Sequence, residues 1–325
     1  MRVKLKQLHY LKAILNHDLN ISSASKSLFA TQPGVSKQIA LLEEELGVKF
    51  FERKGKNLNS VTDIGQKLLD EAFKILELEE KMYSIVRDHL NPQSGCLNIY
   101  TTNTIARFLL PKTVNYFINK YPEISLHVGA AHPDENGAII KKGHSDFSIV
   151  AQKVERDREL IVLPAYKWSL SLILPIGHPL CKESEINLEK ISQYPLISYE
   201  VGSTGRIVQD TAFSARGLKP NYIMTMMDVD VIKKYVGMNI GIGIVASIAA
   251  LNICDKNIMS ISLNGVFSHC DAWICYSRNV FLQKHMYDFI ESFSPHLTKT
   301  VLQEIAHSSY DEIFLLSKEF KLPIY

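Results

Sequence analysis

Basic side chains are concentrated at the start of this 325-residue sequence. Residues 1–56 contain ten Lys or Arg side chains against five Asp or Glu side chains, whereas the rest of the chain is slightly acidic. Lys and Arg neutralise backbone phosphates, and a local basic excess is typical of a segment that binds nucleic acid. We therefore expect phosphate binding by the first sixth of the chain.

Hydroxyl side chains gather in two later segments, each between an apolar run and a helical pattern. Thr102, Asn103 and Thr104 follow the run at residues 96–101, and the loop at residues 200–204 follows the run at residues 196–199. Hydroxyls and backbone N–H groups form an anion site where a strand leads into a helix. One such loop is weak evidence, because Ser and Thr cap many helices. Two loops facing each other across a cleft would bind a small anion.

The common catalytic motifs are missing or incomplete. The Gly-x-Gly at residues 241–243 lacks the third glycine and following helix of a dinucleotide site. The Ser-x-x-Lys at residues 23–26 has no companion hydrolase motif. Asp228 and Asp230 are expected to cap and flank a helix. We expect no enzyme activity, no catalytic residues and no cofactor.

Cysteine usage argues against disulfides and metal sites. The five cysteines are an odd number without C-x-x-C spacing. His269, Cys270 and Cys275 are possible ligands, but small apolar cysteines within a strand are the simpler interpretation. The longest apolar run, at residues 240–253, is too short to span a bilayer, and residues 1–17 are not a credible signal peptide. We expect a cytoplasmic protein without a membrane contact or metal.

The basic side chains need a rigid element to present them. In residues 31–46, apolar side chains spaced by four, three and four form one helical stripe: Val35, Ile39, Leu42 and Leu46. The opposite face carries Pro33, Ser36, Lys37 and Ala40. Residues 20–29 also show helical spacing, and only Ala30 and Thr31 separate the two helices. So tight a joint predicts a helix-turn-helix, although any helical hairpin in an α-rich domain would show the same periodicity.

A second basic segment follows this helical pair. Residues 50–61 predict a two-stranded wing with a turn near Gly55 and Asn57, which would place Arg53 and Lys56 beside backbone phosphates. The alternative is a solvated basic loop.

A long helix is predicted over residues 62–90. Its apolar side chains alternate steps of four and three, as in a coiled-coil seam: Leu68, Ala72, Ile75, Leu78, Met82 and Ile85. Burial of this seam against a second copy predicts a dimer that reads two DNA half-sites. Packing of the seam on the rest of the same chain is the alternative.

After a Pro- and Gly-containing linker at residues 91–95, strand-like runs alternate with helical ones. The predicted strands are residues 96–101, 125–130, 146–151, 160–163, 169–175, 196–199, 223–226, 240–246, 258–263 and 272–277. The alternation predicts parallel α/β sheets in two subdomains around a cleft.

The segments TQPGVSKQIALLEEELGVKFFER and GKNLNSVTDIGQ resemble the winged helix-turn-helix signature of LysR-type transcriptional regulators. The resemblance covers nearly the whole chain and is strongest to the CysB-like branch, which regulates the cysteine regulon. It implies an α/β fold class with three parts: a winged helix-turn-helix at residues 1–61, a linker and dimerisation helix at 62–90, and an effector domain at 91–325. The effector domain is expected to consist of two α/β subdomains and to resemble periplasmic solute-binding proteins.

The resemblance also implies roles for individual residues. Lys37 and Ser36 would reach base edges and phosphates, Gln32 and Pro33 would seat the recognition helix, and Arg53 with Lys56 would hold phosphates on the wing. Ala40 departs from the family, because many relatives have a basic residue there.

The effector pocket of the CysB-like branch maps onto Thr102, Thr104, Trp168 and Thr204. Two positions depart from the branch pattern: Ile105 replaces a usual Gln, and Ala151 replaces a usual Thr. Each lost hydrogen bond to an anion would cost about 1.5–3 kcal/mol.

These observations predict a regulator of sulfur assimilation and cysteine biosynthesis that binds promoter DNA as a dimer or tetramer. Its effector would belong to the sulfate, thiosulfate or acetylserine class. One alternative is a regulator of the same family with another effector, which Ile105 and Ala151 favour. The other is a cytoplasmic solute-binding protein or an enzyme on the same scaffold, against which the basic first ninety residues argue.

Overall fold

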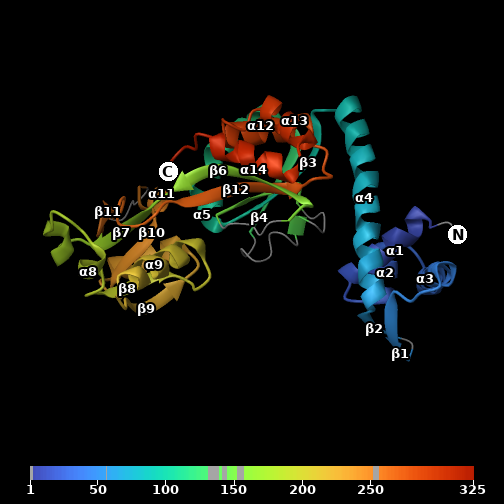
Figure 1. Cartoon of the computed structure of the whole chain (residues 1–325), viewed down its shortest axis with the longest axis horizontal. Coiled ribbons are helices and arrows are strands. Elements are labelled where there is room, and N and C mark those ends of the chain that lie inside the picture. Colours follow the sequence, from blue (N-terminus) through green and yellow to red (C-terminus); the bar gives the residue numbers. More distant parts are fainter. Residues whose placement is uncertain (1–2, 56, 131–138, 141–144, 152–156, 252–255) are drawn as a thin grey trace. The chain divides into compact units, whose positions relative to one another are not determined.

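The computed structural model describes residues 3–55, 57–130, 139–140, 145–151, 157–251 and 256–325. The chain forms two compact units (Figure 1), one of residues 1–90 with 279–281 and the other of residues 91–278 with 282–325. No helix in the described ranges is both long enough and apolar enough to cross a membrane.

The first unit contains the predicted helix-turn-helix and wing. Its elements are α1 (Leu5–Asn16), α2 (Ile21–Ser27), α3 (Gln32–Leu46), β1 (Phe51–Lys54), β2 (Asn57–Val61) and α4 (Asp63–Leu90). Asn20 caps α2 by accepting from Ser23 N at 3.0 Å, and Thr31 caps α3 by accepting from Gly34 N at 3.3 Å. Strands β1 and β2 pair antiparallel around the Gly55 turn.

Helix α2 ends two residues before the predicted limit at residue 29. The Ala30 N–H donates to Ser25 O at 2.9 Å and the Phe29 N–H donates to Lys26 O at 3.2 Å, which closes the helix in a Schellman motif. Phe29 therefore has a positive φ of 49°. Glycine normally occupies this backbone conformation, so a phenylalanine at this position gives no sequence signal for it. The turn between the two helices is consequently four residues long, from Leu28 to Thr31.

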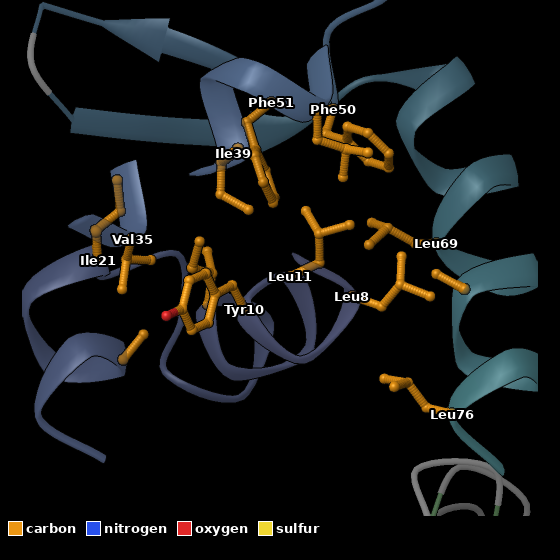
Figure 2. Close-up of a cluster of buried hydrophobic side chains, with 14 residues drawn as sticks. Leu8, Tyr10, Leu11, Ile21, Val35, Ile39, Phe50, Phe51, Leu69 and Leu76 are labelled. Carbon is orange, nitrogen blue, oxygen red and sulfur yellow. The ribbon is translucent and has the colours of Figure 1, made fainter. Parts of the chain in front are cut away.

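Apolar side chains from four helices and the start of the wing meet in one core (Figure 2). Leu11, Val35, Ile39 and Leu69 are almost completely buried in it. The α3 stripe predicted from the four-three-four spacing supplies three of its four members to this core as fully buried residues, and Leu46 packs at its margin. Because this stripe is buried, the opposite face of α3 points toward solvent.

A buried carboxylate joins the end of α3 to the wing. Glu43 is only 2% exposed, and its two carboxylate oxygens accept from the Phe50 backbone N–H and from Lys49 Nζ, both at 3.0 Å. Gly47 ends the helix with φ 70° and lets the chain turn back toward Glu43. Glu43 therefore sets the direction in which the wing leaves α3.

Helix α4 has one apolar segment that is buried in its own unit and another that is exposed. Leu69, Ala72 and Leu76 are buried in the core of the first unit. Farther along, apolar side chains of the predicted seam and their neighbours remain exposed: Ile75, Leu78, Met82, Tyr83, Ile85 and Val86. The second half of α4 thus carries a long apolar surface that its own unit does not cover.

The second unit contains two five-stranded sheets, ordered β4-β3-β5-β12-β6 and β11-β7-β10-β8-β9. The strands are β3 (Ser94–Thr101), β4 (Glu123–Ala130), β5 (Phe147–Val150), β6 (Leu160–Trp168), β7 (Leu170–Pro175), β8 (Pro195–Tyr199), β9 (Asn221–Met226), β10 (Ile242–Ala246), β11 (Ile258–Ser262) and β12 (Cys270–Ser277). Every predicted strand run is present, although β3 begins within the predicted linker.

The prediction of parallel sheets is wrong, because both sheets are mixed. β3, β4 and β5 are parallel, as are β8, β9 and β10, but β12 runs antiparallel to β5 and β6, and β7 runs antiparallel to β10 and β11. The antiparallel strands are those by which the chain passes between the sheets. β6 leads to β7 through Ser169, and β11 leads to β12 through residues 263–269.

Helices cover the sheets, and the C-terminal segment packs on the same unit. They are α5 (Asn103–Phe108), α6 (Leu110–Lys120), α8 (Leu188–Ile191), α9 (Thr204–Ala215), α10 (Val229–Gly237), α11 (Ser247–Leu251), α12 (Lys284–Phe293), α13 (Lys299–His307) and α14 (Tyr310–Glu319). Helices α12, α13 and α14 lie together beside β6 and β12 (Figure 1).

The last residues extend the first sheet at its β6 edge. The Lys167 N–H donates to Pro323 O and the Tyr325 N–H donates to Lys167 O, both at 2.8 Å. The Tyr325 ring meets the Tyr166 ring edge to face, with centroids 5.4 Å apart. The C-terminal segment therefore pairs with the strand that carries Trp168.

Replacing Glu43 with Ala should lower the free energy of unfolding of the first unit by about 2 kcal/mol, because the Phe50 N–H would lose its buried charged acceptor. Calorimetric unfolding of the full chain would measure the effect, with the exposed Glu44→Ala on the same helix as the matched control. Equal transition temperatures for both variants would contradict the proposed link.

Candidate functional site

A cavity of about 310 Å³ lies within the second unit, where the two sheets meet. Loops after β3 and β8 and the crossing strand β6 contribute to its wall. The lining residues are Thr102, Asn103, Thr104, Ile105, Leu109, Ala130, Val150, Ala151, Tyr166, Trp168, Tyr199, Glu200, Val201, Ser203, Thr204, Gly205, Met227, Ala246 and Ile248. The carboxyl ends of parallel strands from both sheets therefore border the same cavity.

The structure brings the four predicted effector residues to this cavity. Thr102 and Thr104 come from the first sheet, Thr204 comes from the second, and Trp168 lies on the strand that joins them. Ile105 and Ala151, the two positions that depart from the branch pattern, line the same cavity. Their apolar side chains make part of its wall unable to donate hydrogen bonds.

The two strand-to-helix loops differ in how their helix ends are capped. Thr102 Oγ1 accepts from the Ile105 N–H at 3.4 Å, so it caps α5. Ser203 precedes α9, but its hydroxyl donates to Glu200 O at 2.8 Å and does not cap the helix. In the described part of the chain, the first-turn N–H groups of Thr204, Gly205 and Arg206 have no acceptor. The start of α9 therefore offers open donors at the cavity.

Aromatic rings form the floor of the cavity around Gly205. The Tyr199 hydroxyl accepts from the Ala246 N–H at 2.9 Å, and burial raises the pKa of Tyr199 well above its ordinary value, so the phenol stays neutral. A Cβ on Gly205 would lie 2.9 Å from Tyr199 Cδ2 and 3.5 Å from Trp168 Cη2. Glycine is thus required for α9 to approach the rings. The Trp168 indole N–H is buried and has no acceptor among the described residues.

Sequence patterns did not single out several of the cavity residues. Tyr166, Tyr199 and Met227 reach the cavity only through the pairing of distant strands, which a local pattern cannot reveal. Glu200 is different, since it stands within the predicted loop at residues 200–204 and is the one charged residue there. Its charge, which is visible in the sequence, is the signal that marks it as a candidate ligand-binding residue.

Two described basic side chains near the cavity are engaged elsewhere. Arg206 donates to Asp210 Oδ1 at 2.8 Å and to Tyr199 O at 3.4 Å, and its guanidinium stacks 3.6 Å from the centroid of the Tyr222 ring. Arg107 pairs with Asp228 and Asp230, and Asp228 caps α10 as predicted. Neither arginine lines the cavity.

The predicted DNA-binding residues lie at the start of α3 and on the wing. Gln32, Pro33 and Lys37 are exposed and Ser36 is half-buried, all within the first two turns of α3. Lys37 forms no ion pair with the residues that the structure describes. An exposed, uncommitted ammonium beside a helix N-terminus is suited to a phosphate or a base edge.

Of the two predicted DNA-binding residues on the wing, the structure describes one. Arg53 is exposed on β1 and has no ion-pair partner in the described ranges, whereas Lys56 lies outside the described residues. Ala40 is also exposed on α3, so the missing basic side chain would have faced solvent.

Metal-ligating side chains do not cluster in the described ranges. No group of three or more His, Cys, Asp or Glu side chains is arranged there to hold an ion. Cys270 and Cys275 are buried in β12, and burial raises the pKa of the Cys270 thiol to about 12. Both thiols are therefore protonated, apolar core groups at neutral pH.

Sequence profiles of two domains match the chain. The profile described as "Bacterial regulatory helix-turn-helix protein, lysR family" matches residues 5–66, and that described as "LysR substrate binding domain" matches residues 91–298.

Individual relatives match over most of their length. The chain is 37% identical to the HTH-type transcriptional regulator CysB of Haemophilus influenzae, over 93% of each chain. It is 32% identical to the HTH-type transcriptional regulator Cbl of Escherichia coli, over 96% of this chain and 99% of that one. The crystal structure of the cofactor-binding domain of the Cbl transcriptional regulator superimposes with a TM-score of 0.62 at 31% identity, covering 66% of this chain and 95% of that domain.

Replacing Gly205 with Ala should displace the Tyr199 ring and weaken its hydrogen bond to Ala246. We expect the free energy of unfolding to fall by about 1–3 kcal/mol, as for other overpacked sites, and the Ala246 amide to exchange hydrogen faster. Chemical denaturation and hydrogen–deuterium exchange would measure both effects. The exposed Ile207→Ala on the same helix is the control, and unchanged exchange at Ala246 would contradict the close approach.

Proposed function

The chain belongs to the LysR family of bacterial transcriptional regulators, and from that premise we propose that it controls genes of sulfur assimilation and cysteine biosynthesis. Regulators of this family bind promoter DNA and small-molecule effectors, form oligomers and are not enzymes. The membership removes the alternatives of an enzyme and of a free solute-binding protein. Its expected location is the cytoplasm, where promoter DNA is found.

The effector is proposed to bind in the cavity between the two sheets of the second unit. The observation that carries this proposal is the convergence of two hydroxyl-rich loops, with Thr102 and Thr104 on one and Thr204 on the other, at a cavity that Trp168 also lines. Small-molecule sites are typically concave, mostly apolar and provided with a few polar groups. The proposed effectors are sulfate, thiosulfate or an acetylserine.

The DNA-binding role is assigned to α3 and the wing. Lys37 and Ser36 are proposed to contact base edges and phosphates, Gln32 and Pro33 to seat the helix, and Arg53 with Lys56 to hold phosphates. The exposed apolar surface of α4 is proposed to pair with that of a second copy in a dimer or tetramer, so that two recognition helices reach two half-sites.

Effector binding is proposed to act by a population shift. A ligand that binds better when the two sheets close on it favours the closed form, which changes how the subunits present their recognition helices. Equal DNA affinity and footprint with and without every candidate ligand would contradict this mechanism.

A second candidate is a LysR regulator with a different effector. Ile105 and Ala151 favour it, because they line the cavity and cannot donate the hydrogen bonds expected for an inorganic anion.

Calorimetric titration of the full chain with sulfate, thiosulfate, O-acetylserine and N-acetylserine should show saturable binding of at least one. Thr102→Ala and Thr204→Ala should each weaken it about tenfold or more, because a hydrogen bond to a charged group is lost. Thr211→Ala, an exposed position on α9, is the matched control.

The same titration separates the two candidate functions. Combining Ile105→Gln with Ala151→Thr restores the residues usual in the CysB-like branch. The double variant should bind sulfate more tightly if Ile105 and Ala151 only weaken an anion site. Absence of binding by all four ligands to the folded protein, together with no gain in the double variant, would favour the different effector.

Replacing Lys37 with Ala should weaken binding to a specific promoter fragment by about tenfold, as expected for a lost base contact, and weaken non-specific DNA binding less. Fluorescence anisotropy at fixed salt would measure both affinities, with the exposed Lys67→Ala on α4 as the control. An equal loss on both DNAs would make Lys37 a phosphate contact and contradict its proposed role.

A further inference from the structure

The cavity has an unusual charge for a site expected to bind an inorganic anion. Among the lining residues in the described ranges, Glu200 is the only Asp, Glu, Lys, Arg or His side chain. In the described part of the chain, the nearby basic residues Arg206 and Arg107 are paired with carboxylates outside the lining. The described side chains that line the cavity therefore carry a formal charge of −1.

The Glu200 carboxylate is available to a ligand. Its backbone is fixed, because Glu200 O accepts from both the N–H and the hydroxyl of Ser203, at 3.2 and 2.8 Å. Its side chain is exposed at the cavity and has no hydrogen bond or ion pair with any residue in the described ranges. A fixed loop thus presents an uncompensated carboxylate at one side of the cavity.

The same loop presents donors at the start of α9. Ser203 does not cap the helix, so the first-turn N–H groups at Thr204, Gly205 and Arg206 have no acceptor in the described part of the chain. α9 is twelve residues long, and its N-terminal end favours negative charge. The Trp168 ring approaches Gly205 of this helix through its Cη2 atom, and its buried N–H also has no described acceptor. The N–H groups at the start of α9, which favour a negative group, and the Glu200 carboxylate, which favours a positive group, are therefore only a few residues apart.

We propose that this cavity selects a small zwitterion of the α-amino-acid class, with its carboxylate at the first turn of α9 and its ammonium group at Glu200. The inference rests on the proposed effector site and specifies which chemistry that site accepts. The apolar wall formed by Ile105, Val150 and Met227 receives the uncharged part of the ligand. A cavity of about 310 Å³ is at the small end of the roughly 300–1,000 Å³ typical of ligand sites.

Two consequences distinguish a zwitterion from a simple anion. Acetylation of the ligand's nitrogen removes its positive charge and leaves Glu200 facing an amide. Sulfate has no positive group at all, so its two negative charges are repelled by Glu200. The wild-type protein should therefore prefer O-acetyl-L-serine to N-acetyl-L-serine, and removal of the Glu200 charge should reduce this preference while improving sulfate binding.

The test is calorimetric titration of the full chain at pH 6.5, which limits migration of the acetyl group from oxygen to nitrogen. The probes are O-acetyl-L-serine, N-acetyl-L-serine, sulfate and a panel of unmodified L-amino acids with their N-acetyl forms. Glu200→Gln keeps the shape of the side chain and removes its charge. Glu185→Gln, an exposed acid outside the cavity lining, is the matched control.

We expect wild type and Glu185→Gln to prefer the free-amine member of at least one pair by about fivefold or more, the range of a partly exposed charge-assisted contact. In Glu200→Gln this preference should fall to near unity, and sulfate affinity should rise. Equal or tighter binding of the N-acetyl form by wild type, or a preference that persists in Glu200→Gln, would overturn the inference.

Failure of the inference is distinguishable from failure of the proposed function. Binding of N-acetylserine or sulfate that depends on Thr102 and Thr204 but not on Glu200 would overturn the zwitterion and leave the effector site in place. Absence of binding by every probe, in protein that still binds a promoter fragment specifically, would overturn the inference and the proposed effector class but not the regulator assignment.

Discussion

The second unit depends on a chain that passes between its two sheets at Ser169. β6 ends at Trp168 in the first sheet and β7 begins at Leu170 in the second, so one residue joins the two. The crossing is tied to α11 by buried hydroxyls: Ser169 Oγ donates to Ser247 Oγ at 2.9 Å, and the Ser247 N–H donates to Ser169 O at the same distance. Because Trp168 and Ala246 adjoin this point and also line the cavity, any change in angle between the sheets must alter the cavity wall.

Local patterns were sufficient for most elements and insufficient for their pairing. Apolar runs located every described strand of the second unit, and the α3 stripe was found because helical periodicity directly reports a buried face. The directions of β7 and β12 were mispredicted, since alternation of strands and helices says nothing about which strands cross between sheets. Phe29 was misassigned to a helix because a non-glycine residue with positive φ has no local sequence signal.

Some residues of the candidate cavity could be predicted from the sequence, and others could not. The loops at Thr102 and Thr204 were identifiable because each follows a strand and precedes a helix. Tyr166 and Met227 were not, because only the folded sheets bring them to the same space. Glu200 shows a different difficulty: its charge is visible in the sequence, but its importance depends on Arg206 and Arg107 being engaged elsewhere, and only the structure supplies those partners.

The pairing of residues 323–325 with β6 also affects how the protein behaves in solution. β6 is the outermost strand of its sheet, and its outer backbone groups would otherwise be a template for strands of other molecules. The C-terminal segment occupies the groups at Lys167 and Ser169, accepting from both N–H groups and donating to Lys167 O. This short segment therefore makes these backbone groups of β6 unavailable for edge-to-edge pairing with another molecule.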